Sequence, residues 1–333
     1  MKGAIIRGAT LQFFSVGSFA VKFFLVGLLL GCTLPPQSAC AQTYPSKPLR
    51  IITAEAGGGS DFATRLLAGP LAAALGQQVL VDNRGLLAAE VAARAPADGY
   101  TLLLSGATLW LQVYLREKVP YQMSDFAPVS LATRAPNILV THPQVPAKSV
   151  QALIALAKAR PGELNYATSG NGNSVHLAGE MFRLMTGVDI VRVNYRGAAR
   201  ALTDLSAGQV QLMFGVPGSV SPHVKAGRLA ALAVTSAEPS PLAPGLPLVA
   251  ATVPGYESVS YLAMFAPTGT PAAVAARLND EVVRVLRRPE VREKFLISGI
   301  EPATGTPEQL ASLVRADMNK MGPMIKAAGI RTD

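Results

Sequence analysis

The feature that most constrains this chain is a unit of local structure that occurs twice: a short apolar strand, a loop of glycine and small polar residues, and a helix. In the first unit the apolar run 49–54 leads into the loop 57–61, and Phe62 and the leucines at 66, 67, 71 and 75 then share one helical face. In the second unit, residues 165–168 predict a strand, 169–174 a loop and 175–186 a helix. Strands that alternate with helices are typical of the α/β class, and two such sets predict two lobes.

The rest of the chain continues this alternation. Short apolar runs between turn residues suit parallel strands that are buried on both faces, so we predict a mostly parallel sheet flanked by helices in each lobe. The predicted strands are 79–81, 101–104, 190–193, 211–214 and 229–235, and the predicted helices are 149–159, 199–207, 271–286, 290–298 and 307–328.

Residues 1–41 differ from the rest and predict a leader for export. Lys2 and Arg7 give it a basic start, an apolar run follows at 23–31, and Ala-Cys-Ala at 39–41 has the small residues of a cleavage site. The apolar run is shorter than the roughly 20 residues that span a bilayer. We therefore expect a signal peptide over 1–41 and a mature protein in the periplasm.

Both cysteines, Cys32 and Cys40, lie in this leader. A chain cleaved after Ala41 has no thiol, which excludes disulfides, thiolate metal sites and cysteine nucleophiles. Residues 29–32 (Leu-Leu-Gly-Cys) weakly resemble a lipoprotein cleavage box. A lipid anchor on Cys32 is therefore the alternative to a free periplasmic protein.

Charge and motif content argue against several function classes. The formal net charge is +9, but the basic residues are scattered, whereas a nucleic-acid-binding face needs them clustered. The three histidines show no metal-ligand spacing, so no metal is expected. Residues 170–172 begin like a dinucleotide fingerprint, but Val175 replaces its third glycine, and no cofactor is expected.

The two glycine-bearing loops lie where ligand sites form in doubly wound sheets, outside the carboxyl ends of strands. Each loop precedes a helix and offers backbone N–H groups and hydroxyls. Such a helix start holds an anion without a countercharge. Together the two loops predict an anion held between two lobes.

Six segments, in their order and spacing, resemble the Bug receptors, the substrate-binding proteins of tripartite tricarboxylate transporters. They are 49–65, 98–103, 125–130, 169–177, 195–198 and 266–271. The resemblance implies the type II periplasmic binding protein fold, in which two α/β lobes joined by a two-strand hinge close on a ligand. It also implies a discontinuous first lobe, 45–141 plus 265–333, and a second lobe, 142–264.

The resemblance further implies a function. Members of that family bind dicarboxylates, tricarboxylates, acidic amino acids or aromatic acids, so we expect a monomeric receptor, not an enzyme, that passes a small carboxylate to membrane transporter subunits. One alternative is a periplasmic ligand sensor that feeds a signalling partner. A more remote alternative is a secreted hydrolase, which would have to assemble Ser169, His176 and Asp204 without a Gly-x-Ser-x-Gly elbow.

By the same resemblance, the ligand contacts come from loops of both lobes. The first lobe is expected to contribute Ala56, Gly57, Gly58, Ser60, Asp61, Ala107 and Thr108. The second is expected to contribute Ser169, Gly170, Asn171, Ser174, His176, Tyr195, Arg196, Gly197 and Ala198.

Several of these residues also have a purely structural interpretation. Asp61 is spaced to pair with Arg65 at i,i+4, and because its carboxylate would repel an anion, we expect it to cap the helix. His176 can pack the loop instead of contacting a ligand, and Arg196 can be solvated. Trp110 is expected in the core more than in the pocket.

The sequence departs from the family pattern in three places. Trp110 lies just past Ala107 and Thr108, where relatives are usually smaller, and could shape the pocket for a flat or apolar ligand tail. The loop after Arg84 lacks the family's glycine-rich stretch and is shorter, which puts a contact from that loop in doubt. Gln211 and Gly215 stand where many relatives carry Asp, which favours a ligand without a cationic amino group.

Overall fold

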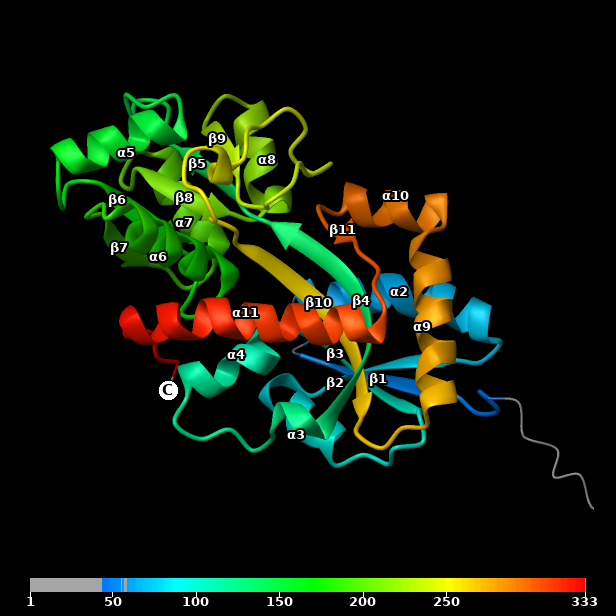
Figure 1. Ribbon diagram of the computed structural model, residues 1–333. Helices are drawn as coiled ribbons and strands as arrows, with labels where there is room; N and C mark the ends of the chain where they lie inside the picture. Colours follow the sequence, from blue (N-terminus) through cyan, green and yellow to red (C-terminus); the bar gives the residue numbers. More distant parts are fainter. Residues whose placement is uncertain (1–43, 55, 57–58, 333) are drawn as a thin grey trace, which may run out of the picture. The chain divides into compact units, whose positions relative to one another are not determined.

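The computed structural model describes residues 44–54, 56 and 59–332 of the chain. The predicted signal peptide, Cys32 and the loop residues Gly57 and Gly58 lie outside the described residues. From Tyr44 onward the chain forms one compact unit. It contains two β-sheets with helices packed against them (Figure 1), which confirms the α/β class.

The larger sheet has six strands in the order β11-β4-β10-β3-β1-β2. β1 (Leu49–Thr53) pairs in parallel with β2 (Val79–Asn83) and with β3 (Thr101–Gly106). β10 (Val259–Pro267) is antiparallel to β3 and to β4 (Phe126–Pro136), and the short β11 (Glu301–Pro302) is antiparallel to β4.

The smaller sheet has five strands in the order β7-β6-β8-β5-β9. β6 (Asn165–Thr168) is parallel to β7 (Val191–Asn194) and β8 (Leu212–Gly215), whereas β5 (Ile138–Thr141) is antiparallel to β8 and to β9 (Ala230–Val234). Both sheets are therefore mixed, and the prediction of mostly parallel sheets was wrong in this respect. The antiparallel pairs all involve β4, β5 or β10, the strands next to the points where the chain passes between sheets.

Helices cover both sheets. They are α2 (Gly59–Leu75), α3 (Ala88–Ala93), α4 (Thr108–Leu115), α5 (Val150–Ala159), α6 (Ser174–Thr186), α7 (Ala198–Ser206), α8 (Pro217–Lys225), α9 (Ala272–Leu286), α10 (Pro289–Ile297) and α11 (Pro307–Ala327), with single 3-10 turns at Gly85–Leu87, Met123–Asp125 and Val249–Ala251. The long α11 lies against β4 and α4 and also contacts α6 (Figure 1).

The buried face of α2 differs slightly from the predicted one. Leu67, Leu71 and Leu75 are buried with β1 and α9, as expected from their spacing. Phe62 is 46% exposed, so its predicted place on the buried face was wrong.

The chain crosses between the two sheets at Asn137 and again ahead of β10. The Asn137 N–H donates to Thr235 Oγ1 at 2.7 Å, and the Ser258 N–H donates to the Thr235 carbonyl at 2.9 Å. These bonds join the two crossing segments to the end of β9. Sheet membership thus changes near residues 137 and 258, whereas the expected lobe boundaries were 141/142 and 264/265. A single residue separates β4 from β5, so the sequence pattern shows no break there.

Candidate functional site

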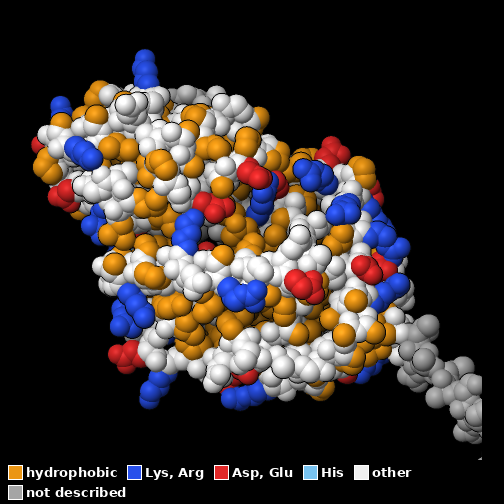
Figure 2. Space-filling model, viewed as in Figure 1, with side chains coloured by type: hydrophobic (Ala, Val, Ile, Leu, Met, Phe, Trp, Pro, Cys, Tyr) orange, Lys and Arg blue, Asp and Glu red, His pale blue; other side chains and the backbone are white. Residues whose placement is uncertain are grey.

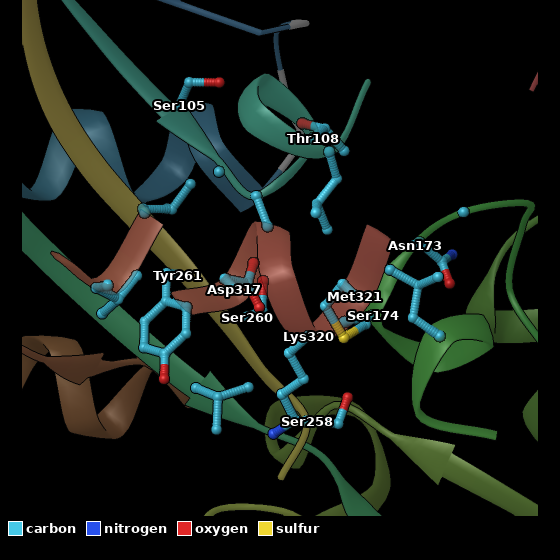
Figure 3. Close-up of a pocket in the computed structure, with 18 of the residues that line it drawn as sticks. Ser105, Thr108, Asn173, Ser174, Ser258, Ser260, Tyr261, Asp317, Lys320 and Met321 are labelled. Atoms are coloured by element: carbon cyan, nitrogen blue, oxygen red, sulfur yellow. The ribbon is translucent and has the colours of Figure 1, made fainter. Parts of the chain in front are cut away.

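A cavity of about 350 Å³ lies where loops from both sheets meet α11 (Figure 3). Its walls come from the ends of β1 and β3, the starts of α2, α4 and α6, the first half of β10, and one face of α11. Of the predicted contacts that the structure describes, four line this cavity: Ser60, Ala107, Thr108 and Ser174.

The wall at the end of β3 is rich in hydrogen-bond donors. β3 runs parallel to β1, so the loops after both strands emerge at the same edge of the sheet. Ser105 and Gly106 end β3, and α4 begins at Thr108. The residue before the helix is Ala107, whose methyl group cannot cap the first N–H groups of α4. This helix start therefore presents backbone donors beside the Thr108 hydroxyl.

The facing wall is the start of α6. Asn173 caps this helix, because its side-chain oxygen accepts from the His176 N–H at 3.0 Å. Its Nδ2 donates to Ser169 Oγ at 3.1 Å. Ser169 is thus turned toward Asn173, and Asn173 and Ser174 line the cavity in its place. The sequence analysis missed Asn173.

Other residues predicted in this loop hold the loop itself. Asn171 Nδ2 donates to the Arg331 carbonyl at 2.7 Å, and the Gly172 N–H donates to His176 Nδ1 at 3.0 Å. His176 is only 1% exposed, and Arg192 Nη1 lies 2.6 Å from its Nε2. Burial, and then the charge of Arg192, lower the pKa of His176 to about 4. Of the two interpretations of His176, the contacts favour the loop-packing one. Gly170 is not among the lining residues.

The segment from Tyr195 to Ala198 does not line this cavity. It follows β7, the edge strand of the smaller sheet, and leads into α7. Arg196 and Gly197 are exposed, and none of the four residues is among those that line the cavity. Ala56, in the first loop, is also exposed and outside the lining.

Asp61 is held by its own neighbours. Its carboxylate lies 2.8 Å from Arg65 Nε and accepts from Asn83 Nδ2 at 3.0 Å. The i,i+4 pair with Arg65 was predicted. Because α2 already begins at Gly59, Asp61 is in the first turn and is not the residue that precedes the helix. Asp61 does not line the cavity.

The structure brings residues to the cavity that the sequence analysis missed. Asp317, Lys320 and Met321 occupy one face of α11, and Ser260 comes from the start of β10, with Ser258 just before that strand (Figure 3). Glu257 also precedes β10 and lines the cavity. The spacing of 313, 316, 317, 320 and 321 is that of one helical face, which is the signal that could have selected them. The same spacing is equally expected for a helix face that packs in the core, so it does not by itself indicate a ligand site.

Two hydrogen-bonded pairs order this wall. Trp110 Nε1 donates to Asp317 Oδ2 at 2.6 Å, and Lys320 Nζ donates to the Glu257 carbonyl at 2.7 Å. Trp110 is fully buried, as expected for a core residue. Burial raises the pKa of Asp317, and the Trp110 N–H and Lys320 oppose that rise.

Basic side chains gather elsewhere on the molecule. Figure 2 shows Lys and Arg over α9 and α10. A second cavity, of about 550 Å³, has Arg284, Arg287 and Arg288 in its lining. The basic residues are therefore not scattered everywhere, as the sequence had predicted, because some of them gather around α9 and α10. Arg284 pairs with the buried Glu281. The described residues contain no cluster of three or more His, Cys, Asp or Glu that could hold a metal. Within the same residues, no helix combines the length and apolar character needed to cross a bilayer.

Comparison with known proteins identifies a family. A model described as "Tripartite tricarboxylate transporter family receptor" matches residues 63–330. The protein in the tcbD-tcbE intergenic region of a Pseudomonas species is 34% identical over 310 residues, covering 90% of this chain and 92% of its own. BugT from Bordetella pertussis is 33% identical over 316 residues, covering 92% and 97%.

Solved structures agree. An R. palustris protein described with adipate has a TM-score of 0.72 at 35% identity, covering 86% of this chain and 99% of its own. MatC from Rhodopseudomonas palustris, described with bound malate, has a TM-score of 0.67 at 28% identity, covering 85% and 100%. A Polaromonas TctC solute-binding protein has a TM-score of 0.78 at 22% identity over 86% and 100% of the two chains, which shows the shared fold. These similarities confirm the predicted two-lobed binding-protein fold.

Proposed function

Because this chain belongs to the tripartite tricarboxylate transporter receptor family, a family of solute-binding receptors, we propose that it captures a small carboxylate and delivers it to the membrane subunits of such a transporter. The observation that carries the proposal is the convergence of uncharged donors on one cavity. The start of α4, the start of α6 and the Ser60 hydroxyl come from three separate strand–loop–helix units. Helix starts of this kind favour an anion.

The relatives support the carboxylate class. The R. palustris protein is described with adipate and MatC with malate, and both are small carboxylates. The cavity volume of about 350 Å³ lies in the range of small-molecule sites. Binding between loops of two sheets also provides a way to exclude water when the loops approach each other, which strengthens hydrogen bonds to the carboxylate.

We assign the two lobes by sheet. The six-stranded sheet and α11 form one lobe, the five-stranded sheet forms the other, and the crossings near residues 137 and 258 form the hinge. The remaining predicted contacts, including Ser169 and the segment 195–198, belong in this proposal to the second lobe and stay predicted contacts. Export by the leader 1–41 places the receptor in the periplasm, where a monomer serves the transporter.

Two alternatives differ from this proposal in what they require. A sensor uses the same ligand site but binds a signalling partner, so a ligand-binding assay does not separate the two and a transport assay does. A hydrolase needs a serine activated by a histidine base. Ser169 Oγ accepts from Asn173, and His176 Nδ1 accepts from the Gly172 N–H, which argues against that pair.

The test is a binding screen of the purified protein against monocarboxylates, dicarboxylates, tricarboxylates and aromatic acids by thermal shift. A ligand that binds the folded state raises the melting temperature by mass action. Trp110 is the single tryptophan of the chain and bonds to a cavity residue, so its emission should change with each true hit. Failure of every carboxylate to shift the melting temperature would overturn the proposal.

A further inference from the structure

The charged side chains of the cavity are gathered at its α11 end. Among the described lining residues, Glu257, Asp317 and Lys320 are the ones with a charge. Lys320 Nζ donates to the Glu257 carbonyl at 2.7 Å and lies 3.5 Å from its carboxylate, so these two charges offset each other. Asp317 makes no ion pair with the described residues, and the α11 end therefore has a net negative charge.

The position of Asp317 is held by the core. Trp110 donates from its indole nitrogen to Oδ2, and the indole is fully buried and packed near Phe265. That indole is the one hydrogen-bond donor that the described part of the chain gives this carboxylate. A carboxylate has room for about four such bonds, so it can accept from a second donor in the cavity.

The opposite end of the cavity has the reverse character. Thr108, Asn173 and Ser174 bring hydroxyl and amide groups to the starts of α4 and α6, and the described lining has no acidic side chain there. Figure 3 shows Thr108 and Asn173 away from the α11 side chains Asp317 and Lys320, whereas Ser174 lies nearer to Met321. The cavity thus has an end suited to an anion and an end suited to a donor.

From this polarity we propose that the ligand is a carboxylate whose far end carries a hydrogen-bond donor, a hydroxyl or an ammonium group, which Asp317 accepts. The inference rests on the proposed function, since it assumes a carboxylate at the α4 and α6 end. A second carboxylate at the α11 end would meet Asp317 as a like charge in a partly buried site, which disfavours both ionised groups.

The inference reverses one expectation from the sequence, that the ligand lacks a cationic amino group. That expectation used Gln211 and Gly215 as sites of a lost carboxylate. Gln211 Oε1 accepts from the Asn165 N–H, and a Cβ at Gly215 would clash with Val220. Neither residue is among those that line the cavity, so neither position decides the charge there. Asp317, which lies on α11, supplies the negative charge instead.

The experiment measures the affinity of the full chain, purified as the cell exports and processes it, for a matched six-carbon series. The probes are hexanoate, hexanoate with a terminal hydroxyl, hexanoate with a terminal amine, and adipate, with the corresponding four-carbon series beside them. We expect the hydroxyl or the amine compound to bind at least about tenfold more tightly than both the methyl-ended and the dicarboxylate compound, the factor expected for one charge-assisted hydrogen bond.

The variant Asp317→Asn keeps an acceptor for Trp110 and removes the charge. It should weaken the amine or hydroxyl compound about tenfold and strengthen adipate relative to the wild type. Asp280→Asn, an equal charge change on the exposed face of α9 outside this cavity, is the control and should change neither affinity.

The possible failures can be told apart. If carboxylates bind but adipate is the tightest and Asp317→Asn leaves the order unchanged, the Asp317 inference is overturned while the receptor function stands. If no member of either series binds and no carboxylate in the wider screen does, the proposed function itself fails. A selectivity switch on Asp317→Asn with unchanged tryptophan emission in the free protein supports the inference, because the fold around Trp110 is then intact.

Discussion

At the scale of single residues, the polar groups beneath the second glycine loop are engaged with one another. His176 accepts from the Gly172 N–H and lies against Arg192, and Glu180 holds the Tyr166 hydroxyl and Arg183. Because these side chains hold the loop, the residues at its end, Asn173 and Ser174, reach the cavity in a defined position. His176 therefore holds the loop that carries these two cavity residues.

The lowered pKa of His176 predicts how stability depends on pH. Its pKa is about 4 in the folded protein and about 6.5 when exposed, so the unfolded chain binds more protons between these values. The free energy of unfolding should therefore fall as pH drops from 6.5 toward 4, with a contribution from this residue of up to about 3 kcal/mol. Urea unfolding across this range measures the slope.

The variant His176→Gln supplies the comparison. Glutamine does not titrate, so the variant should lose part of the slope, whereas His142→Gln, at a half-buried histidine outside the loop, should retain it. Equal slopes in His176→Gln and the wild type would contradict the assignment.

At the scale of elements, the crossing segments are joined through one threonine. Thr235 follows β9, is fully buried, and its Oγ1 accepts from the Asn137 N–H at 2.7 Å. Asn137 Nδ2 in turn donates to the Ser174 carbonyl at 3.0 Å, which links the crossing to the start of α6. The point where the chain changes sheets is thus one bond away from the cavity wall.

Thr235→Val tests this connection, because valine keeps the shape and removes the hydroxyl. It leaves the buried Asn137 N–H without its acceptor, so the variant should lose about 1–3 kcal/mol of unfolding free energy. The loss is measured by denaturant unfolding. Thr203→Val, at an exposed hydroxyl on α7 that bonds to the Ala199 carbonyl, should change stability by less than about 0.5 kcal/mol. Equal effects of the two substitutions would count against the role of Thr235.

The helices with a regular apolar spacing were predicted well from the sequence. α5, α6, α9 and α11 begin and end within two residues of the predicted bounds. In the structure, side-chain caps at Ser149, Asn173 and Thr306 mark the starts of α5, α6 and α11. β4 and β10 were not predicted as long strands. They cross the middle of the larger sheet as antiparallel partners, and the pairing between residues more than a hundred positions apart leaves no local periodicity.

At the scale of the whole molecule, the cavity joins segments that the sequence separates widely. Trp110 and Asp317 are 207 positions apart, yet they form one hydrogen-bonded pair. The sequence predicted the loops after β1 and β6, because glycines and hydroxyls mark them, and the family resemblance added Ala107 and Thr108 after β3. It did not predict the α11 wall, since an amphipathic helix shows which face is buried and not what that face is buried against.

The end of the described chain also belongs to this site. The Thr332 N–H donates to the Leu115 carbonyl at 3.0 Å, and the Arg331 carbonyl accepts from Asn171, while Leu115 and Gly172 line the cavity. Deleting residues 331–333 should cost about 1–3 kcal/mol of stability, since two hydrogen bonds are lost, and should weaken ligand binding. Calorimetry on the truncated and intact chains measures both quantities. Asn171→Ala, which removes one of the two bonds, should have a smaller effect, and unchanged affinity after truncation would contradict this role.

The anchoring of Arg331 and Thr332 has a practical consequence for anyone who purifies or immobilises this receptor. A fusion partner attached at the C-terminus follows closely on residues 331 and 332, whose hydrogen bonds to Asn171 and Leu115 adjoin the cavity. A C-terminal affinity handle should therefore depress measured ligand affinities and blur differences between compounds. A handle placed ahead of Tyr44 would leave this corner of the protein untouched.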